Sequence, residues 1–357
     1  MNNLKRLLRQ ESVWIPIISI VIGIVIGAIV MLIGGYDPLL AYSSLVQKIF
    51  GSVYDVGETL RQIVPLILAG LAVAIAFRGG MFNIGVEGQI VMGSLGALMV
   101  GNMIDLPPII HGIVAIIVGA LFGGIWGALV AIFKVKRGLN EVISCIMLNW
   151  IALYISHITI KAFMAEAGTS RSQMIHDSAS IQIQWLSDLF NGARIHWGFF
   201  IVIFILIGYY YYMNRTKWGY ELRAVGYNKH AAEYAGMNVS SIAIRTFFIS
   251  GAIGGLIGTF EVLGVFKYMA IAANTSGTGF DGIAVALLGM NSALGVFLSS
   301  TLFGALYYGA QGMSFGADVP PEVIKMVISI IIFFAAAPGA IRMFIKMFKR
   351  KSKREEG

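Results

Sequence analysis

Charged side chains are scarce in this sequence. Only 12% of its 357 residues are Asp, Glu, Lys or Arg, whereas 57% are hydrophobic and the mean hydropathy is +0.80. An ordinary soluble domain carries about 25% charged residues, so this chain has too few of them to cover a surface that faces water. The composition excludes an ordinary soluble protein and indicates helices that pack against one another in lipid, where the 43 glycines allow close approach.

Cysteine and nucleotide-binding motifs are also nearly absent. The single cysteine, Cys145, lies in an apolar stretch, which excludes a disulfide framework within the chain and a multi-cysteine metal site. No Gly-Lys dipeptide occurs, so the sequence lacks the phosphate-binding loop that ATP hydrolysis requires, and it has no H-E-x-x-H zinc motif. We therefore expect no enzymatic activity and no cofactor, and any ATPase would be a separate subunit.

Long uncharged runs occur throughout the chain. A bilayer core about 30 Å thick is crossed by about 20 apolar residues in a helix. The sequence predicts an all-α transmembrane bundle of about nine or ten spans, some of them broken or half helices, in one membrane domain over residues 1–347. The predicted spans are Trp14–Gly34, Ile63–Phe77, Ile84–Met103, Ile109–Phe133, Val142–Ile160, Trp197–Tyr212, Ile242–Val265, Leu294–Tyr308 and Val327–Ala340.

The basic residues indicate how the bundle is oriented. Most of the 26 Lys and Arg residues lie in short segments between apolar runs, which is typical of membrane topology and not of a nucleic-acid-binding face. Because short basic loops stay in the cytoplasm, both termini and the loop 214–238 are predicted inside, and the loop 164–196 outside. The basic tail 348–357 is expected to be disordered or to lie on anionic lipid headgroups.

Two segments interrupt the helical pattern. One is R-G-G-M-F-N-I-G-V-E-G-Q, Arg78–Gln89. The other is Lys267–Gly312, which must cross the membrane twice although T-S-G-T-G-F-D-G is followed by only a short apolar run, Ile283–Gly289. Irregular backbone at membrane depth is tolerated where protein or a water-filled cavity satisfies its polar groups. We expect a broken or half helix that lines a solute pathway, the alternative being a Gly-rich external loop.

Polar side chains within the membrane are functional candidates, because they are costly when unpaired. Amides would bind the edges of a neutral, hydroxyl-rich solute and two phenylalanines its aromatic face. The alternatives are a first-turn carboxylate for Glu87 and an interhelical hydrogen-bond anchor for Asn149. Glu261 and Asp281 flank the second break. The candidate pathway residues are Phe82, Asn83, Glu87, Gln89, Asn149, Phe280 and Asp281.

The cytoplasmic segment 214–238 is polar, yet it contains a short amphipathic pattern. Ala231, Ala232 and Ala235 would line one face of a short helix that Gly236 ends. Such a helix can dock into another protein. The alternative is a solvated loop helix without a special role.

Four segments, in order along most of the chain, resemble the permease subunits of ATP-binding-cassette importers in the branched-chain amino acid and ribose branch. The resemblance is strongest to nucleoside permeases. The segments are G-M-F-N-I-G-V-E-G-Q at 80–89, L-N-E-V-I-S-C-I-M-L-N-W at 139–150, L-R-A-V-G-Y-N-K-H-A-A-E-Y-A-G at 222–236 and F-D-G-I-A-V-A-L-L-G at 280–289.

This resemblance implies an ATPase-coupling helix at about residues 231–236. The wider permease signature begins Glu-Ala-Ala and has Gly four residues after the second Ala. Here His230 takes the Glu position, Ala231, Ala232 and Gly236 match, and no Leu-Pro ending follows. The resemblance further implies a cytoplasmic ATPase subunit, a second permease chain, an extracytoplasmic solute-binding protein and a location in the bacterial inner membrane.

The function that the resemblance implies is ATP-driven import of nucleosides such as guanosine or uridine. Within the same class, the alternative is a permease for simple sugars of the ribose type. An ion-coupled secondary transporter would instead work alone and carry a titratable carboxylate at the midplane of the membrane. A membrane scaffold or receptor without transport is the remaining alternative.

Overall fold

The computed structural model describes residues 11–336, and within this range the regular structure is helical, with isolated β-bridges and no strands. The helices form two compact units. The larger unit comprises Val53–Gly304, and the smaller combines the chain up to Ser52 with the chain from Ala305. The predicted basic tail 348–357 and the end of the last predicted span, 337–340, lie outside the described residues.

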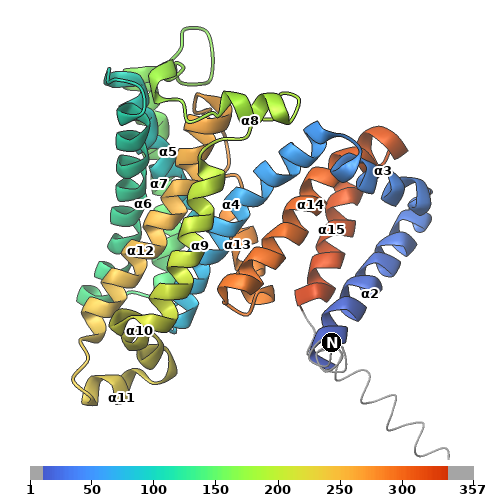
Figure 1. The fold of residues 1–357 in the computed structure, drawn as a ribbon. Helices are drawn as coiled ribbons and strands as arrows, with labels where there is room; N and C mark the ends of the chain where they lie inside the picture. Colours follow the sequence, from blue (N-terminus) through green and yellow to red (C-terminus); the bar gives the residue numbers. More distant parts are fainter. Residues whose placement is uncertain (1–10, 337–357) are drawn as a thin grey trace, which may run out of the picture. The chain divides into compact units, whose positions relative to one another are not determined.

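The longer helices follow the apolar runs of the sequence (Figure 1). The boundaries of these helices are α2 Glu11–Ile33, α3 Pro38–Phe50, α4 Val53–Arg78, α5 Val86–Met103, α6 Ile110–Arg137, α7 Glu141–Thr159, α9 Gly198–Arg215, α12 Val239–Phe260, α14 Ala293–Ala317 and α15 Pro321–Ala336. The shorter elements are η1 Ile160–Met164, η2 Asp177–Ala179, α8 Gln184–Leu189, α10 Lys217–Tyr227, α11 Lys229–Tyr234, η3 Glu261–Phe266 and α13 Thr278–Leu288.

Six helices within the described residues are long and apolar enough to cross a membrane. They are α4, α6, α7 continued through η1, α9, α12 continued through η3, and α14. Each coincides with a predicted span, and the other three predicted spans fall on α2, α5 and α15. The all-α, multi-span fold is therefore confirmed.

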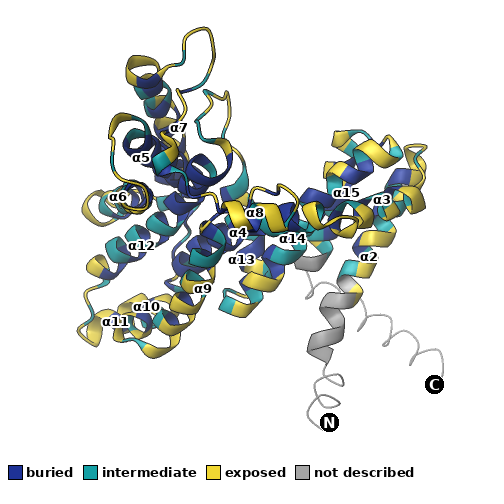
Figure 2. Ribbon diagram, turned by 45° about the horizontal axis from the view of Figure 1, so that its top comes forward, coloured by how far each residue is buried: buried dark blue, intermediate teal, exposed yellow. Residues whose placement is uncertain are grey.

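Glycine governs how closely the helices of the larger unit pack. An ideal Cβ on Gly123 of α6 would lie 2.5 Å from the carbonyl oxygen of Gly251 on α12, so the two backbones touch. The most apolar 18-residue stretch of each helix differs in how far it is buried. The buried share of this stretch is 72% in α4 and 67% in α12 continued through η3, but only 22% in α9. Figure 2 shows the buried residues concentrated on α4, α5 and α12, so these helices form the centre and α9 the periphery of the unit.

The smaller unit is held by close contact between α2 and α15. An ideal Cβ on Gly23 would lie 2.7 Å from the Cα of Ile331. The Tyr42 hydroxyl of α3 donates a hydrogen bond to the carbonyl oxygen of Ile24, at 2.8 Å. This bond joins α3 to α2 through a backbone group.

Both predicted breaks are present in the larger unit. Helix α4 ends at Arg78, Gly80 adopts a left-handed φ of 68°, and α5 starts only at Val86. After η3 the chain runs without helix from 267 to 277, and α13 is an 11-residue half helix that packs on α4. The loop 164–196 with α8 and the pair α10–α11 lie at opposite ends of this unit (Figure 1).

Candidate translocation site

Asn83 occupies the centre of the first break. Its side chain is fully buried, and its Nδ2 donates to the Ser250 hydroxyl at 2.7 Å and to Gln89 Oε1 at 3.2 Å. Its Oδ1 accepts from the Gly85 amide at 2.9 Å and from Gln89 Nε2 at 3.2 Å. The Ser250 hydroxyl donates in turn to the Ala72 carbonyl at 2.6 Å. This network joins the α4–α5 break to α12 and to the interior of α4, and it satisfies the Gly85 amide, which lies in the break.

Asn149 holds the other side of the break from α7. Its Oδ1 accepts from the Gly88 amide at 2.8 Å, and its Nδ2 donates to the Ile84 carbonyl at 3.1 Å. These are the hydrogen bonds of an interhelical anchor. The structure thus brings Asn83, Gln89 and Asn149 together around the start of α5, where their amides bind the protein itself.

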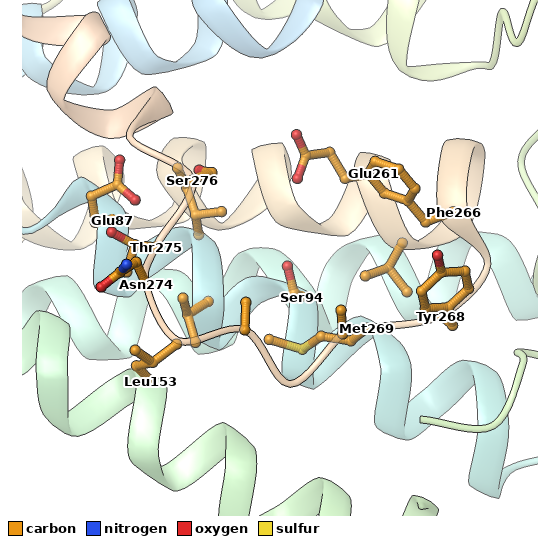
Figure 3. Close-up of a pocket in the computed structure, with 15 residues that line it drawn as sticks. Glu87, Ser94, Leu153, Glu261, Phe266, Tyr268, Met269, Asn274, Thr275 and Ser276 are labelled. Atoms are coloured by element: carbon orange, nitrogen blue, oxygen red, sulfur yellow. The ribbon is translucent and has the colours of Figure 1, made fainter. Parts of the chain in front are cut away.

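A cavity of about 320 Å³ lies on another face of α5. Figure 3 shows the loop Tyr268–Ser276 running along it, with Glu87 near the Ser276 end and Phe266 and Tyr268 at the other end. The cavity is mostly apolar with a few polar groups, as small-molecule sites are, and its volume falls at the low end of their usual range of about 300–1,000 Å³. Its lining residues are Glu87, Ile90, Val91, Ser94, Leu153, Glu261, Val262, Phe266, Tyr268, Met269, Ala270, Ala272, Asn274, Thr275 and Ser276.

Of the seven pathway residues predicted from the sequence, Glu87 lines this cavity. Its Oε1 accepts a hydrogen bond from the Gly279 amide at the start of α13, at 2.6 Å. Phe82 is half-buried and packs against Phe77, with ring centroids 5.1 Å apart. Phe280 is 45% exposed on α13, and neither it nor Asp281 is among the described residues that line the cavity.

The loop 267–277 is fastened to the segment 164–196, which we call the cap. The Ser172 amide donates to the Met269 carbonyl and the Ile271 amide to the Ser170 carbonyl, both at 2.9 Å. The Arg171 guanidinium lies 4.7 Å from the centroid of the Tyr268 ring. Sequence reasoning missed the cavity residues of this loop, although the polar T-S-G-T-G stretch marked the place.

The cap is anchored to α4 by an ion-pair cluster. Glu58 is 1% exposed and accepts hydrogen bonds from Arg194 Nη2 at 2.9 Å and from Arg61 Nε at 2.8 Å. His196, at the end of the cap, is 3% exposed, and its Nδ1 accepts from the Gly198 amide at 3.1 Å. Burial lowers the pKa of His196 to about 4, helped by the positive charge of Arg61 and opposed by Glu58.

At the opposite end, the predicted coupling segment forms two short helices. Asn228 caps α11 by accepting from the Ala231 amide at 3.0 Å, and Gly236, with a φ of 81°, ends the turn. His230 and Ala231 are exposed, whereas Ala232 is 4% exposed and packs within its own chain. Tyr234 is 95% exposed. The exposed residues of α11 therefore include His230, Ala231 and Tyr234, whereas Ala232, which the sequence predicts on the same face as Ala231, is not among them.

Helix α10 touches the first break directly. An ideal Cβ on Gly226 would lie 2.2 Å from the Arg78 carbonyl oxygen, and one on Gly80 would lie 3.2 Å from the Gly226 Cα. A second cavity, of about 580 Å³, is lined by α10, by residues 235–238 and by the start of α12. Arg245 lies at its wall, donating to Glu221 at 3.0 Å with its guanidinium 5.0 Å from the Trp218 ring centroid.

Comparisons with known proteins cover almost the whole chain. The family described as "Branched-chain amino acid transport system / permease component" matches residues 56–336. The guanosine ABC transporter permease protein NupP of Bacillus subtilis (strain 168) is 43% identical over 96% of this chain and 98% of its own length. The nucleoside ABC transporter permease protein NupB of Lactococcus lactis subsp. cremoris (strain MG1363) is 34% identical over 98% of this chain and 96% of its own.

A more distant relative carries a sugar in its name. The glucose ABC transporter permease protein TsgB13 of Haloferax volcanii is 28% identical over 89% of this chain and 86% of its own length. No solved structure matches this chain.

Proposed function

Because this chain belongs to the family of branched-chain amino acid transport system permease components and is a multi-pass protein of the cell membrane, we propose that it imports nucleosides as the membrane subunit of an ATP-binding-cassette transporter. The observation that carries the proposal is the full-length similarity, at 43% and 34% identity, to two permeases named for guanosine and nucleosides. The relative named for glucose is less similar, at 28% identity, and a simple sugar is the second candidate solute.

The ATPase subunit docks on α11 at the cytoplasmic end of the larger unit. Exposed His230, Ala231 and Tyr234 supply the surface, and buried Ala232 together with Gly236 sets the shape of the turn. The termini are cytoplasmic, as the basic loops predict. The cap lies outside and receives an extracytoplasmic binding protein, and a second permease chain completes the pathway.

The contact between α10 and the first break provides a route for coupling. Gly226 rests on Arg78 and Gly80, and Asn83 lies three residues further along the chain. Because backbone meets backbone at this contact, no flexible side chain absorbs a displacement of α10. Movement of α11 by the ATPase is transmitted through α10 to the α4–α5 break and the start of α5, which carries Glu87.

Uptake by the assembled transporter tests the function. Cells expressing this chain with its ATPase, second permease and binding protein would be given radiolabelled guanosine, uridine, ribose and glucose. We expect nucleoside accumulation that is lost with a hydrolysis-deficient ATPase and persists when the proton gradient is collapsed. Accumulation of sugar alone would favour the second candidate, and accumulation that follows the proton gradient would contradict an ATP-driven importer.

The docking surface has its own test. An Ala231→Arg substitution places a long charged side chain on the exposed face of α11, and we expect the ATPase to be lost from the purified complex. Ala167→Arg, at an alanine that is also exposed but lies in the cap, is the matched control and should leave the ATPase bound. Retention of the ATPase by the Ala231→Arg chain would contradict docking at α11.

A further inference from the structure

The N-termini of two helices meet beside the cavity. Helix α5 begins at Val86 and α13 at Thr278, and an ideal Cβ on Gly279 would lie only 2.8 Å from the Glu87 backbone nitrogen. Each helix N-terminus carries a partial positive charge and unsatisfied amide groups. The Glu87 carboxylate lies where these two ends converge, and its Oε1 accepts the Gly279 amide at 2.6 Å. The contact joins the two segments that the sequence marks as irregular.

The second carboxylate oxygen of Glu87, Oε2, has no hydrogen-bond partner among the residues that the structure describes. The residue is 1% exposed, and no described residue donates a hydrogen bond to its Oε2. A buried carboxylate oxygen without a donor is costly, and such groups in native proteins are nearly always satisfied by protein, water or a ligand. Glu87 also lines the cavity, and its Oε2 is itself buried in this conformation, so the atom becomes an acceptor for a small molecule there when the side chain turns towards the cavity.

The remaining polar groups of the cavity define the kind of solute it takes. Glu261 contributes a second carboxylate, and Asn274, Thr275 and Ser276 contribute an amide and two hydroxyls next to Glu87 (Figure 3). Among the described lining residues there is no Lys, Arg or His. A phosphate group would meet two carboxylates and no cation, so the site disfavours nucleotides and favours neutral molecules that donate hydrogen bonds.

We propose that Glu87 is a solute-binding residue whose Oε2 accepts an N–H or O–H hydrogen bond from a nucleoside in this cavity. The inference rests on the proposed function and adds a contact to it. Guanosine offers two sources of such donors, the N1–H and 2-amino group of the base and the hydroxyls of the ribose. Phe266 and Tyr268 supply aromatic surface at the other end of the cavity.

A Glu87→Gln substitution separates the two roles of the side chain. The amide oxygen of Gln can still accept the Gly279 amide, whereas the amide nitrogen replaces the free acceptor with a donor. We expect the KM for guanosine uptake to rise about tenfold or more, because an unmatched polar contact discriminates strongly between solutes. The melting temperature and ATPase binding should be unchanged. Glu322→Gln, an exposed position on α15, is the matched control.

Solute analogues identify which donor reaches Glu87. Inosine lacks the 2-amino group, and 2′-deoxyguanosine lacks one ribose hydroxyl. An analogue that lacks the group bound by Glu87 has no contact to lose in the Glu87→Gln chain. The analogue whose KM changes least on this substitution therefore identifies the donor that binds Glu87. An unchanged KM for guanosine would overturn the proposal, as would an equal loss for all nucleosides with a lowered melting temperature, which is the result expected of a purely structural residue.

A second measurement does not depend on the Glu87 variant folding. In a Cys145→Ala chain, Thr275→Cys places a thiol at the cavity wall, and we expect saturating guanosine to slow its labelling by a maleimide reagent at least several-fold. Absence of protection while the same transporter still imports guanosine would overturn the cavity as the site. Absence of nucleoside uptake by the unmodified transporter would instead contradict the proposed function.

Discussion

His196 makes the stability of the cap depend on pH. Burial holds its pKa at about 4 in the folded chain, against 6.5 for an ordinary histidine. Between these pH values the unfolded chain takes up a proton at His196 that the folded chain does not. The contribution of neutral His196 to the free energy of unfolding is therefore fully present above pH 6.5 and is lost as the pH drops towards 4. The loss can reach about 1.4 kcal/mol per pH unit.

We therefore expect the melting temperature of the purified protein to fall between pH 6.5 and pH 5, and to fall less in a His196→Asn variant. The Asn side chain oxygen can accept the Gly198 amide as Nδ1 does now, at 3.1 Å, but does not titrate. The same pH dependence in both proteins would show that His196 is not the group responsible.

Asn83 is the residue whose loss should most disturb the first break. An Asn83→Ala substitution leaves the Gly85 amide, the Ser250 hydroxyl and the Gln89 amide short of partners in a buried place. We expect a loss of roughly 2–4 kcal/mol, measured as a lower melting temperature, because each unsatisfied buried group costs about 1–3 kcal/mol. Asn214→Ala is the control, since Asn214 is exposed and bonds only within α9. Equal melting temperatures would contradict the structural role.

At the residue scale, the sequence predicts which polar side chains lie at the break, but it does not predict which groups they bind. Asn83, Gln89 and Asn149 stand out because amides are rare in apolar runs, and all three lie at the break. Their partners, Ser250 and the backbone of 84–88, depend on how α7 and α12 approach α5, which local pattern does not encode. A period of 3.6 residues does indicate that Glu87 and Gln89 point apart, and they do.

Among the elements, the helices follow from composition and the loops between them do not. A run of about 20 apolar residues has few alternatives to a transmembrane helix, so nine predicted spans fall on nine helices. The parity of crossings also predicts the half helix, found as α13. The cavity escapes prediction because it needs the loop 267–277 to pair with the cap, about 100 residues away in the sequence.

The crossing of α6 and α12 tests how far the fold depends on small residues. An alanine at Gly123 would bring a methyl group 2.5 Å from the Gly251 carbonyl and 2.6 Å from the Gly255 Cα. We expect Gly123→Ala to destabilise the protein by about 1–3 kcal/mol, the usual cost of overpacking, and to lower its melting temperature.

The matched control is Gly208→Ala on α9, where no atom of a described residue beyond the adjoining turns of α9 lies within 4 Å of the added Cβ. That substitution should leave the melting temperature unchanged or raise it, because alanine favours the helix over glycine by about 0.8–1.0 kcal/mol. If both variants behave alike, the close approach of α6 and α12 does not limit stability.

For the whole molecule, the predicted orientation in the membrane depends on which segments lie at the two ends of the larger unit. The cap and α10–α11 lie at opposite ends of the larger unit, so assigning one end to the cytoplasm assigns the other to the outside (Figure 1). The excess of Lys and Arg in the loop 214–238 predicts that the α10–α11 end is cytoplasmic. The two proposed partners, the ATPase and the binding protein, then face different compartments.

Thiol labelling of whole cells measures this sidedness directly, because the single native cysteine, Cys145, is fully buried. In a Cys145→Ala chain, Trp185→Cys places a thiol on the cap at a position 63% exposed, and Tyr234→Cys places one on α11 at a position 95% exposed. With a membrane-impermeant maleimide we expect intact cells to label Trp185→Cys alone and permeabilised cells to label both. Labelling of Tyr234→Cys in intact cells, with Trp185→Cys protected, would invert the topology and exclude an ATPase at α11.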